Sequence, residues 1–503
     1  MLSIHADTVP PPPPAAFNMA AHVLAHAETQ PDKTALAILS ASRAARWRYG
    51  ALAQAIEGIG AGLLAFGLTP GDRLLMRLGN EVEFPLAFLG AIWAGIVPIP
   101  ASAALTVPEI TRIAAETRPA AIVAAPDISL PDPCPCPVIP TLALREMETT
   151  PPCAPDLGDP NRPAYIIYTS GTSGKPRGVV HAHRAVWARQ MMWRDWYDLR
   201  PDDRVLHAGA FNWTYTLGTG LLDPWAIGAT ALIPAAGTKP PQLPLLMRRH
   251  DATLFAAAPG VYRQMLRDAG SLNLPKLRHG LSAGEKLPAR LRQAWEEATG
   301  RAVHEALGMS ECSTYLSGSP SRPAPDGSSG YPQSGRRLAI LGPNNQPVAR
   351  ETPGILAIHR DDPGLMIGYL DAPEETEARF AGDWFPTGDT ARMAEDGAIS
   401  YLGRDDDMMN AGGFRVSPLE VEAVLARFPG ISEIACAEVE VKADTTVIGA
   451  FYTGPEELDT DALTAFASEN LASYKCPRLY RQLDSLPRNA NGKINRRALS
   501  PDG

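Results

Sequence analysis

The sequence predicts an α/β protein with a large N-terminal domain of several subdomains and a small α+β C-terminal domain. The chain has 503 residues, more than one ordinary hydrophobic core accommodates. Amphipathic helical patterns alternate with short apolar strand patterns up to about residue 310, as in layered α/β folds. Short strands punctuated by Gly and Pro follow, and a new helix–strand pattern begins after residue 407. These three observations fix the expected class.

The N-terminal domain is predicted to span residues 1–403, with α/β layers followed by a β subdomain. Between 17 and 125, "YGALAQAIEGIGAGLLAFG" is typical of an amphipathic helix and "AAIVAA" of a short buried strand. The alternation continues from 164 to about 310 with the strand patterns "RVLHAGA", "TALIPA" and "ATLFAAA". From 330 to 403, segments such as "GILAIHR" and "GAISYLGR" predict the mostly β subdomain.

The C-terminal domain is predicted over residues 408–503, after a hinge at 404–407. The segment "SPLEVEAVLARFPG" predicts a helix with Ser417 as N-cap and Pro418 in the first turn. The strand patterns "EIACAEVEV" and "TTVIGAFYT" follow, and then the helical pattern "DTDALTAFASENL". Asp405 to Asp407 would ordinarily form a solvated acidic turn, but at a domain boundary they suit a pivot.

Charge and composition exclude several classes of function. A formal net charge of −9 disfavours nucleic acid as the main partner. The most apolar run, "FPLAFLGAIWAGIVPIP", has about 17 residues and three prolines, so a buried core helix is expected rather than a membrane span. The N-terminal segment does not resemble a secretory signal. The six cysteines lack zinc-site spacing and predict reduced thiols in the cytoplasm. The proline-rich stretch from 126 to 155 is expected to be a surface connection.

The stretch "YIIYTSGTSGKPRGVVHAH" predicts a loop that holds phosphate. A Walker A loop is excluded, because Thr169 replaces its first glycine and "GVVHAH" favours a strand where that motif needs a helix. A strand–loop–strand remains, in which hydroxyl groups, glycine N–H groups and one lysine face an anion. The residues concerned are Thr169, Ser170, Gly171, Thr172, Ser173, Gly174 and Lys175. An ordinary surface turn is the alternative, but turns rarely concentrate so many such residues.

Three weaker motifs carry further polar groups. In "GMSE", Glu311 beside Ser310 suits a hard cation such as Mg²⁺ that also binds nucleotide phosphates. In "WFPTGD", Asp389 would accept two vicinal ribose hydroxyls, and Arg404 offers a fork for phosphate oxygens. In "PRNANGKINR", Lys493 lies in a Gly-containing turn. Taken singly, a lone Glu such as Glu311 is usually a solvated surface group, and Lys493 is as compatible with an ordinary basic tail as with a site.

In combination and in this order, the motifs resemble those of the adenylate-forming superfamily. This group comprises acyl- and aryl-CoA synthetases, nonribosomal peptide adenylation domains and firefly luciferase. The matching stretches are "YTSGTSGKPRGVVHAH", "GMSE", "WFPTGD", "GRDDDMMNAGGFRVSPLEVE" and "PRNANGKINR". The resemblance runs from about residue 17 to 500. It is strongest to benzoate-type aryl-CoA ligases and medium-chain acyl-CoA synthetases.

The resemblance implies a reaction and a role for each matched residue. A carboxylate attacks the α-phosphate of ATP to give an acyl-adenylate, and the thiol of coenzyme A then takes the acyl group. The C-terminal domain is expected to be mobile between these steps. The loop from Thr169 to Lys175 would hold the β,γ-phosphates, and a cytoplasmic monomer or homodimer is expected. The other implied roles are Mg²⁺ binding by Glu311, α-phosphate contact by Ser310, ribose contact by Asp389, and contact with ribose or phosphate by Arg404. A hinge is implied at Asp406, catalysis of adenylation by Lys493, and a pantetheine tunnel beside Gly413.

The acid-binding pocket is expected around "GAFNWTYTLGTGLLDPW" and "LSAGEKLP". Trp213 and Tyr215 would face a wall of small residues, which predicts a flat apolar slot for an aromatic or alicyclic carboxylate. The remaining expected pocket and adenine-site residues are Gly218, Ala283, Gly284, Glu285 and Gly308. Many relatives have an aromatic residue before the glycine of "GMSE", where this chain has Leu307. The expected stacking on adenine is therefore absent at that position.

Three alternative functions stay open at the level of sequence. A medium-chain fatty acid is the second choice of substrate. A stand-alone adenylation enzyme that loads a carrier protein is another, although the segment "FNWTYTLG" lacks an acidic residue for a substrate amine and only Asp223 lies nearby. A non-catalytic binding protein with this fold is disfavoured, because Lys175, Glu311, Asp389 and Lys493 are all present.

Overall fold

The largest sheet of the N-terminal domain has nine strands. The computed structural model describes residues 1–6, 10–169, 177–267, 270–411, 414–442, 445–471, 475–489 and 492–500. The inner strands β14, β13, β12, β10, β11 and β2 run parallel, and β15, β16 and β3 continue the sheet antiparallel at its two ends. The inner strands are almost wholly buried, as expected for parallel strands covered on both faces. In sheet order, the bounds are Tyr331–Pro332 (β16), Ser313–Ser317 (β15), Val303–Met309 (β14), His279–Ala283 (β13), Leu254–Ala257 (β12), Arg204–His207 (β10), Thr230–Pro234 (β11), Thr34–Leu39 (β2) and Ala44–Arg48 (β3).

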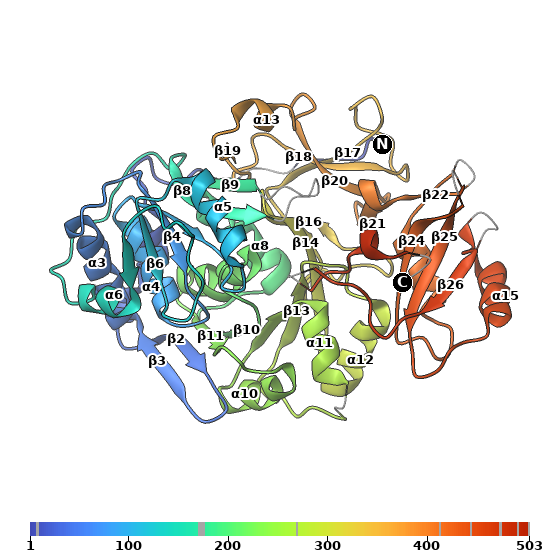
Figure 1. Cartoon of the computed structure of the whole chain (residues 1–503), viewed down its shortest axis with the longest axis horizontal. Helices are drawn as coiled ribbons and strands as arrows, with labels where there is room; N and C mark the ends of the chain where they lie inside the picture. Colours follow the sequence, from blue (N-terminus) through green and yellow to red (C-terminus); the bar gives the residue numbers. More distant parts are fainter. Residues whose placement is uncertain are drawn as a thin grey trace.

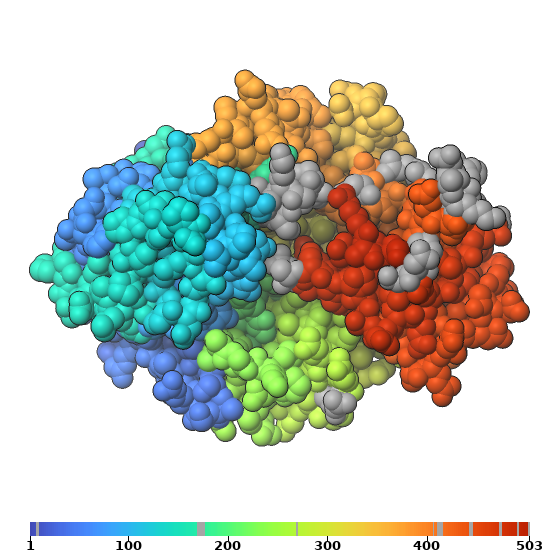
Figure 2. Space-filling view, viewed as in Figure 1, coloured from blue at the N-terminus to red at the C-terminus, as the bar shows by residue number. Residues whose placement is uncertain are grey.

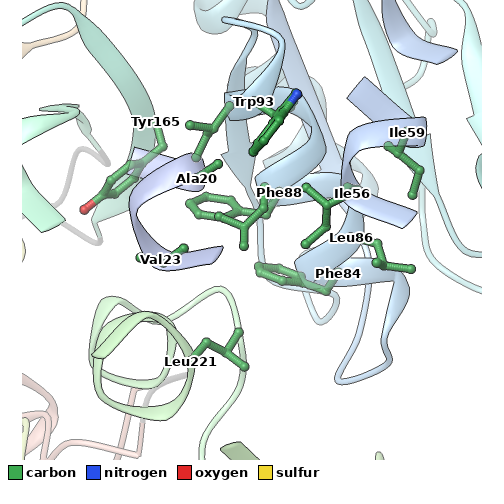
Figure 3. Packing of buried hydrophobic residues seen from close by; sticks show 14 of the residues in the cluster. Ala20, Val23, Ile56, Ile59, Phe84, Leu86, Phe88, Trp93, Tyr165 and Leu221 are labelled. Carbon is green, nitrogen blue, oxygen red and sulfur yellow. The ribbon is translucent and has the colours of Figure 1, made fainter. Parts of the chain in front are cut away.

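A second, parallel sheet packs beside the largest apolar cluster. Its order is β5 (Val97–Pro100), β4 (Arg73–Arg77), β6 (Ala121–Ala124) and β7 (Val138–Pro140). The apolar run noted in the sequence forms the buried helix α4 (Glu83–Trp93) and then strand β5. Figure 3 shows Phe84, Leu86 and Phe88 of α4 against Ile56 and Ile59 of α3 (Tyr49–Ala65). Within the described residues, no helix has both the length and the apolar character that crossing a membrane requires.

A small three-stranded sheet presents the phosphate-loop motif. Strands β8 (Pro163–Thr169) and β9 (Arg177–Ala182) pair antiparallel, and β19 (Gly368–Tyr369) pairs with β9. The predicted strand–loop–strand is therefore confirmed for its two strands. Residues 170–176, which form the loop, lie outside the described residues.

The β subdomain is a five-stranded antiparallel sheet, drawn in yellow and orange at the top of Figure 1. Four strands come from the predicted region: β17 (Arg337–Leu341), β18 (Gly354–His359), β20 (Trp384–Met393) and β21 (Ile399–Arg404). The fifth, β1 (Ile4–Ala6), comes from the N-terminus and pairs with β17. The sequence did not predict this strand, because three residues are too few to show the alternation of apolar and polar residues that marks a strand.

The C-terminal domain is α+β, as predicted. It contains a two-stranded sheet, β22 (Met409–Ala411) with β23 (Phe414–Val416), and a three-stranded sheet, β24 (Glu433–Lys442), β25 (Thr445–Thr453) and β26 (Leu479–Gln482). Helix α14 (Pro418–Leu425) starts at Ser417, whose side chain accepts a hydrogen bond from the Glu420 N–H. This is the expected N-cap. Helix α15 (Thr460–Asn470) completes the domain.

Helices cover the sheets of the N-terminal domain and connect their strands. The proline-rich stretch at 126–155 contains strand β7 and helix α6, so its prediction as a plain surface connection is wrong. Its apolar residues Ile139 and Leu144 are buried in the main cluster, which outweighs the local proline content. The remaining helices are α1 (Met19–Leu24), α2 (His26–Thr29), α5 (Val107–Thr117), α6 (Thr141–Met147), α7 (Arg184–Ala188), α8 (Gln190–Met192), α9 (Asp223–Ala226), α10 (Leu243–Arg249), α11 (Pro259–Leu266), α12 (Ala289–Thr299) and α13 (Pro373–Glu377). Two π-helices, η1 (Trp193–Tyr197) and η2 (Thr216–Leu222), and the 3₁₀ helices η3 (Pro240–Gln242), η4 (Asp405–Asp407) and η6 (Arg496–Ala498) are also present.

Candidate active site

The predicted site residues that the structure describes lie mostly in the N-terminal domain, and Lys493 of the C-terminal domain lies close enough to Glu285 and Asp389 for their charges to interact. Figure 2 shows a hollow at the centre of this face, between the blue-to-teal lobe and the red C-terminal domain. Strand β8 ends at Thr169, whose backbone alone is described. Ser170, Gly171, Thr172, Ser173, Gly174, Lys175 and Gly413 lie outside the described residues. Their assigned roles stay predictions.

Glu311 lies in the tight connection between β14 and β15. The Tyr369 hydroxyl donates a hydrogen bond of 2.9 Å to Glu311 Oε1, and the Met366 N–H donates one of 2.7 Å to the Glu311 carbonyl. Both the backbone and the carboxylate are therefore held in place. Gly308 was expected to line the acid slot, but the hairpin itself accounts for a glycine at this position. A Cβ on residue 308 would lie 2.4 Å from the Ser313 carbonyl oxygen on the opposite strand.

Asp389 and Arg404 are direct partners across β20 and β21. Arg404 Nη1 donates to Asp389 Oδ1 at 2.9 Å, and the Tyr315 hydroxyl donates to Asp389 Oδ2 at 3.4 Å. Burial raises the pKa of Asp389, and the Arg404 charge opposes this rise. The two residues predicted to contact the ribose therefore form one preorganised pair.

Lys493 of the C-terminal domain lies near enough to this pair for their charges to affect its pKa. Its backbone lies in a turn, where the Lys493 N–H donates to Asn489 Oδ1 at 3.1 Å. Its ammonium group interacts with Glu285 and Asp389 of the N-terminal domain. Desolvation between the domains lowers the pKa of Lys493, and the two carboxylates counter this. The residue as a whole is still exposed, so it is the charged end of the side chain that the neighbouring groups desolvate.

The predicted acid slot ends in a small cavity. The volume of this cavity is about 20 Å³, enough for one water molecule. Arg189 contributes a buried guanidinium group to its wall, so this part of the expected apolar slot carries a polar group. The lining residues are Tyr165, His181, Arg189, Thr214, Leu217, Gly218, Leu222, Ser310 and Ser313. Figure 3 shows the Tyr165 hydroxyl pointing away from the labelled apolar side chains.

The glycines of the slot make room for large side chains of the protein itself. A Cβ at Gly218 would lie 2.2 Å from Arg189 Cζ. Gly284 has a φ of +98°, and a Cβ there would lie 2.7 Å from the Trp213 ring. Trp213 and Tyr215 pack edge to face with their ring centroids 5.2 Å apart. The slot is therefore narrower and more polar than its glycine content predicts.

Sequence reasoning missed three polar residues of the site: His181, Arg189 and Tyr369. His181 is visible in the motif stretch as the first histidine of "HAH", but its pattern is also that of an ordinary buried strand. Arg189 lies in the helical stretch after β9, where a single arginine gives no sign of burial. Its partner Asp223 is 34 positions away, so only the fold brings the two together.

Comparisons with known proteins agree with this geometry. A family model described as AMP-binding enzyme matches residues 23–370, and one described as AMP-binding enzyme C-terminal domain matches residues 420–493. Benzoate–CoA ligase of Thauera aromatica is 30% identical over 479 residues, covering 90% of this chain and 90% of that protein. The 4-hydroxybenzoate–CoA/benzoate–CoA ligase of Rhodopseudomonas palustris is 30% identical over 484 residues, covering 90% and 88%.

The fold agrees with solved structures as well. A benzoate CoA ligase from Burkholderia xenovorans LB400 superposes with a TM-score of 0.84 at 27% identity, covering 95% of this chain and 99% of that one. An anthranilate CoA ligase in complex with anthranoyl-AMP superposes with a TM-score of 0.86 at 25% identity, covering 96% of each. Because the two family models follow in order and the relatives match along nine-tenths of its length, the chain belongs to the AMP-binding enzymes, the adenylate-forming superfamily.

Proposed function

We propose that this protein is an AMP-forming carboxylate–CoA ligase that acts on an aromatic carboxylic acid. The observation that carries the proposal is the position of Lys493. This residue of the C-terminal domain interacts with Asp389 and Glu285 across the domain boundary. A cation delivered there suits a reaction in which negative charge develops between a carboxylate and a phosphate.

Each step of the reaction then uses groups that the fold has placed. A carboxylate oxygen of the acid attacks the α-phosphorus of ATP, and pyrophosphate leaves. Lys493 would neutralise charge on the two reacting groups, while Asp389 and Arg404 would position the ribose. The thiol of coenzyme A then attacks the acyl carbon, and AMP leaves. The second step does not need Lys493 in place, which fits a C-terminal domain that moves between the steps.

Glu311 fits the expected metal. A carboxylate oxygen is the kind of ligand that Mg²⁺ takes, and the Tyr369 hydroxyl holds Glu311 in one orientation. No group of three or more His, Cys, Asp or Glu side chains with metal-site geometry occurs in the described part of the chain. When bound, Mg²⁺ would neutralise phosphate charge.

Several observations support an aromatic acid and coenzyme A over the alternatives. Two relatives named above are benzoate or hydroxybenzoate CoA ligases. Another relative, the human mitochondrial acyl-coenzyme A synthetase ACSM2A, is 27% identical over 527 residues, and fatty acids therefore stay among the acids to be tested. An amino-acid substrate is disfavoured, because Asp223 is already paired with Arg189 at 2.6 Å and cannot serve a substrate amine. The six free cysteines support a reducing compartment such as the cytoplasm.

An acid panel tests the proposal. Release of AMP is measured with ATP, Mg²⁺ and coenzyme A for benzoate, hydroxybenzoates, cyclohexanecarboxylate and fatty acids from C4 to C10. Thioester formation with an aromatic acid is the expected result. A preference for a fatty acid would show that the substrate is a fatty acid and not an aromatic acid. Acyl transfer to a carrier protein but not to coenzyme A would show that the acceptor is a carrier protein. Absence of pyrophosphate exchange with every acid would overturn the enzyme proposal itself.

A further inference from the structure

The turn that carries Ser310 and Glu311 is held by the small sheet of β8, β9 and β19, although the turn itself joins β14 to β15. From β9, His181 Nε2 lies 2.8 Å from the Ser310 carbonyl oxygen. A carbonyl oxygen can only accept, so the His181 ring donates this hydrogen bond. From β19, the Tyr369 hydroxyl donates at 2.9 Å to Glu311 Oε1. Two strands of one sheet therefore contact the two predicted site residues of the turn.

Both donor side chains are buried and fixed in orientation. His181 is 2% exposed and Tyr369 is 7% exposed. The His181 ring stacks on the Tyr165 ring of β8, with the ring centroids 4.8 Å apart and the planes 18° from parallel. The Tyr369 backbone pairs with Val179 of β9, and the Tyr369 N–H donates to Thr376 Oγ1 at 2.9 Å. Each side chain can therefore hold its acceptor in one position, away from competing water.

The same sheet carries both ends of the predicted phosphate loop. Thr169, the last residue of β8, pairs with Arg177, the first residue of β9. Arg177 Cζ lies 5.1 Å from the centroid of the Tyr369 ring, which is within the range of a cation–π interaction. The Arg177 guanidinium group also forms an ion pair with Glu375 of α13. Tyr369 thus contacts the residue after the loop with its ring, and the carboxylate predicted to bind Mg²⁺ with its hydroxyl group.

We propose that Tyr369 and His181 are positioning residues for the nucleotide and its metal, because they fix the Ser310–Glu311 turn against the sheet that carries the phosphate loop. This inference rests on the proposed function and concerns the adenylation step alone. A carboxylate has acceptor sites on both oxygens, so a hydrogen bond at Oε1 leaves Glu311 able to bind Mg²⁺. Loss of a group that holds a metal-binding carboxylate changes metal affinity or activity by about 10- to 100-fold.

The first test removes the hydrogen bond to Glu311. In Tyr369→Phe, the Mg²⁺ concentration for half-maximal pyrophosphate exchange should rise by about 10- to 100-fold, with the KM for the acid unchanged. Thioester formation from a supplied acyl-adenylate should also be unchanged, because that proposed step involves no ATP. Tyr168→Phe is the matched control, since the Tyr168 hydroxyl of β8 donates at 3.0 Å to Glu116, which belongs to none of the site motifs. It should keep the native Mg²⁺ requirement.

A binding measurement separates positioning of the metal from loss of turnover. Binding of Mn²⁺, used in place of Mg²⁺ in the presence of ATP and without an acid, is measured by electron paramagnetic resonance. Tyr369→Phe should weaken it by a similar factor, and Tyr168→Phe should not. A native Mn²⁺ affinity together with a native Mg²⁺ requirement in Tyr369→Phe overturns the inference while leaving the ligase reaction intact. Absence of pyrophosphate exchange with every acid in the native protein contradicts the proposed function instead.

A double-mutant cycle tests whether Tyr369 acts through Glu311. The rate of pyrophosphate exchange at a fixed Mg²⁺ concentration is compared for Glu311→Gln, Tyr369→Phe and the double variant. Tyr369→Phe should change the rate of the Glu311→Gln variant by less than about twofold, because residues that act on one site are not additive. Losses that multiply in the double variant would show that Tyr369 does not act through Glu311, which contradicts the assignment.

The role of His181 is tested on the KM for ATP. In His181→Phe this KM should rise by about 2- to 10-fold, the effect of losing one neutral hydrogen bond, with the KM for the acid unchanged. His181→Gln, which keeps an N–H donor, should recover part of the loss. His279→Phe is the matched control, since His279 Nε2 also lies 2.8 Å from a backbone carbonyl oxygen, that of Tyr197, but at the N-terminal end of β13. It should keep the native KM for ATP. An unchanged KM for ATP in His181→Phe, or a KM for the acid raised by the same factor, contradicts the assignment.

Discussion

At the scale of single residues, the proposed reaction depends on one cation that the C-terminal domain would supply. Lys493 interacts with Glu285 and Asp389, and desolvation between the domains lowers its pKa. A protonated lysine stabilises the charge that develops on the carboxylate and the α-phosphate. Because its pKa is lowered, the ammonium form is lost at a lower pH than for an ordinary lysine.

The first prediction is therefore that Lys493→Ala reduces adenylate formation by about 10²–10³-fold, the cost of one lost electrostatic contact in a transition state. Thioester formation from a supplied acyl-adenylate should stay nearly unchanged. In the native protein, adenylate formation should decline as the pH rises through the lowered pKa. Lys493→Arg, which stays charged, should remove that decline. Pyrophosphate exchange and thioester release measure the two steps, and equal losses in both would contradict the role.

Sequence alone predicted the residues that lie in motifs and missed those that depend on distant partners. Glu311, Asp389, Arg404 and Lys493 occur in short stretches whose residue types show their chemistry. The Arg189–Asp223 pair has no such stretch. Gly218 was predicted to widen the slot, but the structure shows that it makes room for Arg189. A glycine in a sequence does not reveal which neighbour needs the space.

At the scale of elements, the backbone of the turn after β13 lies directly against a residue of the acid slot, so a change in the turn would also affect the slot. Gly284 has a φ of +98°, and a Cβ there would meet the Trp213 ring. Gly237 has a φ of +79°, and a Cβ there would have no neighbour within 4 Å. Both positions disfavour an L side chain, at a cost of about 1–3 kcal/mol. Only a side chain at Gly284 would also move a residue of the slot.

We therefore expect Gly284→Ala and Gly237→Ala to lower the free energy of unfolding by similar amounts, measured by chemical denaturation. Gly284→Ala should in addition change the relative kcat/KM of the acids, as Trp213→Ala should, because the Trp213 ring is displaced. Gly237→Ala should keep the acid preference of the native protein. An unchanged preference in Gly284→Ala would mean that Trp213 does not limit the slot.

The segment that connects the two domains is a second element whose backbone conformation can be tested by substitution. Asp405–Asp407 form the 3₁₀ helix η4, and 3₁₀ helices in general have φ of about −50° to −70°, a range that includes the value of about −65° that proline imposes. The predicted hinge variant Asp406→Pro should therefore tolerate the orientation seen here, in which Lys493 reaches the site. Pyrophosphate exchange should survive while thioester formation falls steeply. A folded variant that slows neither step would place the hinge elsewhere.

The sequence predicted helices and strands correctly where a hydrophobic pattern continued over many residues. It missed elements that form only because they pair with, or pack against, segments far away in the chain. Helices α3 and α15 follow from their own patterns. Strand β1 has three residues and exists because β17 offers an open edge. Strand β7 and helix α6 lie in a proline-rich stretch and exist because the neighbouring sheet and α3 bury their apolar residues.

At the scale of the whole molecule, two arginines of the N-terminal domain hold the C-terminal domain in its present orientation. Arg263 of α11 pairs with Glu433 of β24 at 2.7 Å, and Arg290 of α12 donates to the Ile431 carbonyl at 2.9 Å. In Figure 1, α11 and α12 lie beside the red domain. Within the C-terminal domain, Glu433 also pairs at 2.6 Å with Arg488, which precedes the Lys493 turn. One carboxylate thus joins the domain boundary to the catalytic loop.

The last prediction follows from this arrangement. Arg263→Gln removes the contact between the domains and leaves the Glu433–Arg488 pair intact. A partly exposed ion pair contributes about 0.2–1 kcal/mol, so adenylate formation should slow by about 1.5- to 5-fold. Thioester formation from a supplied acyl-adenylate should not slow, because the proposed second step takes place in another orientation of the C-terminal domain.

Glu420→Gln is the matched control, since Glu420 pairs with Lys475 inside the C-terminal domain. It should change neither step by more than the error of measurement. High salt should weaken the Arg263 contact in the native protein and reproduce part of the variant's effect. If Arg263→Gln slows both steps alike, or neither, the Arg263–Glu433 pair does not set the orientation, and the balance between the two half-reactions must come from the remaining contacts around Lys493.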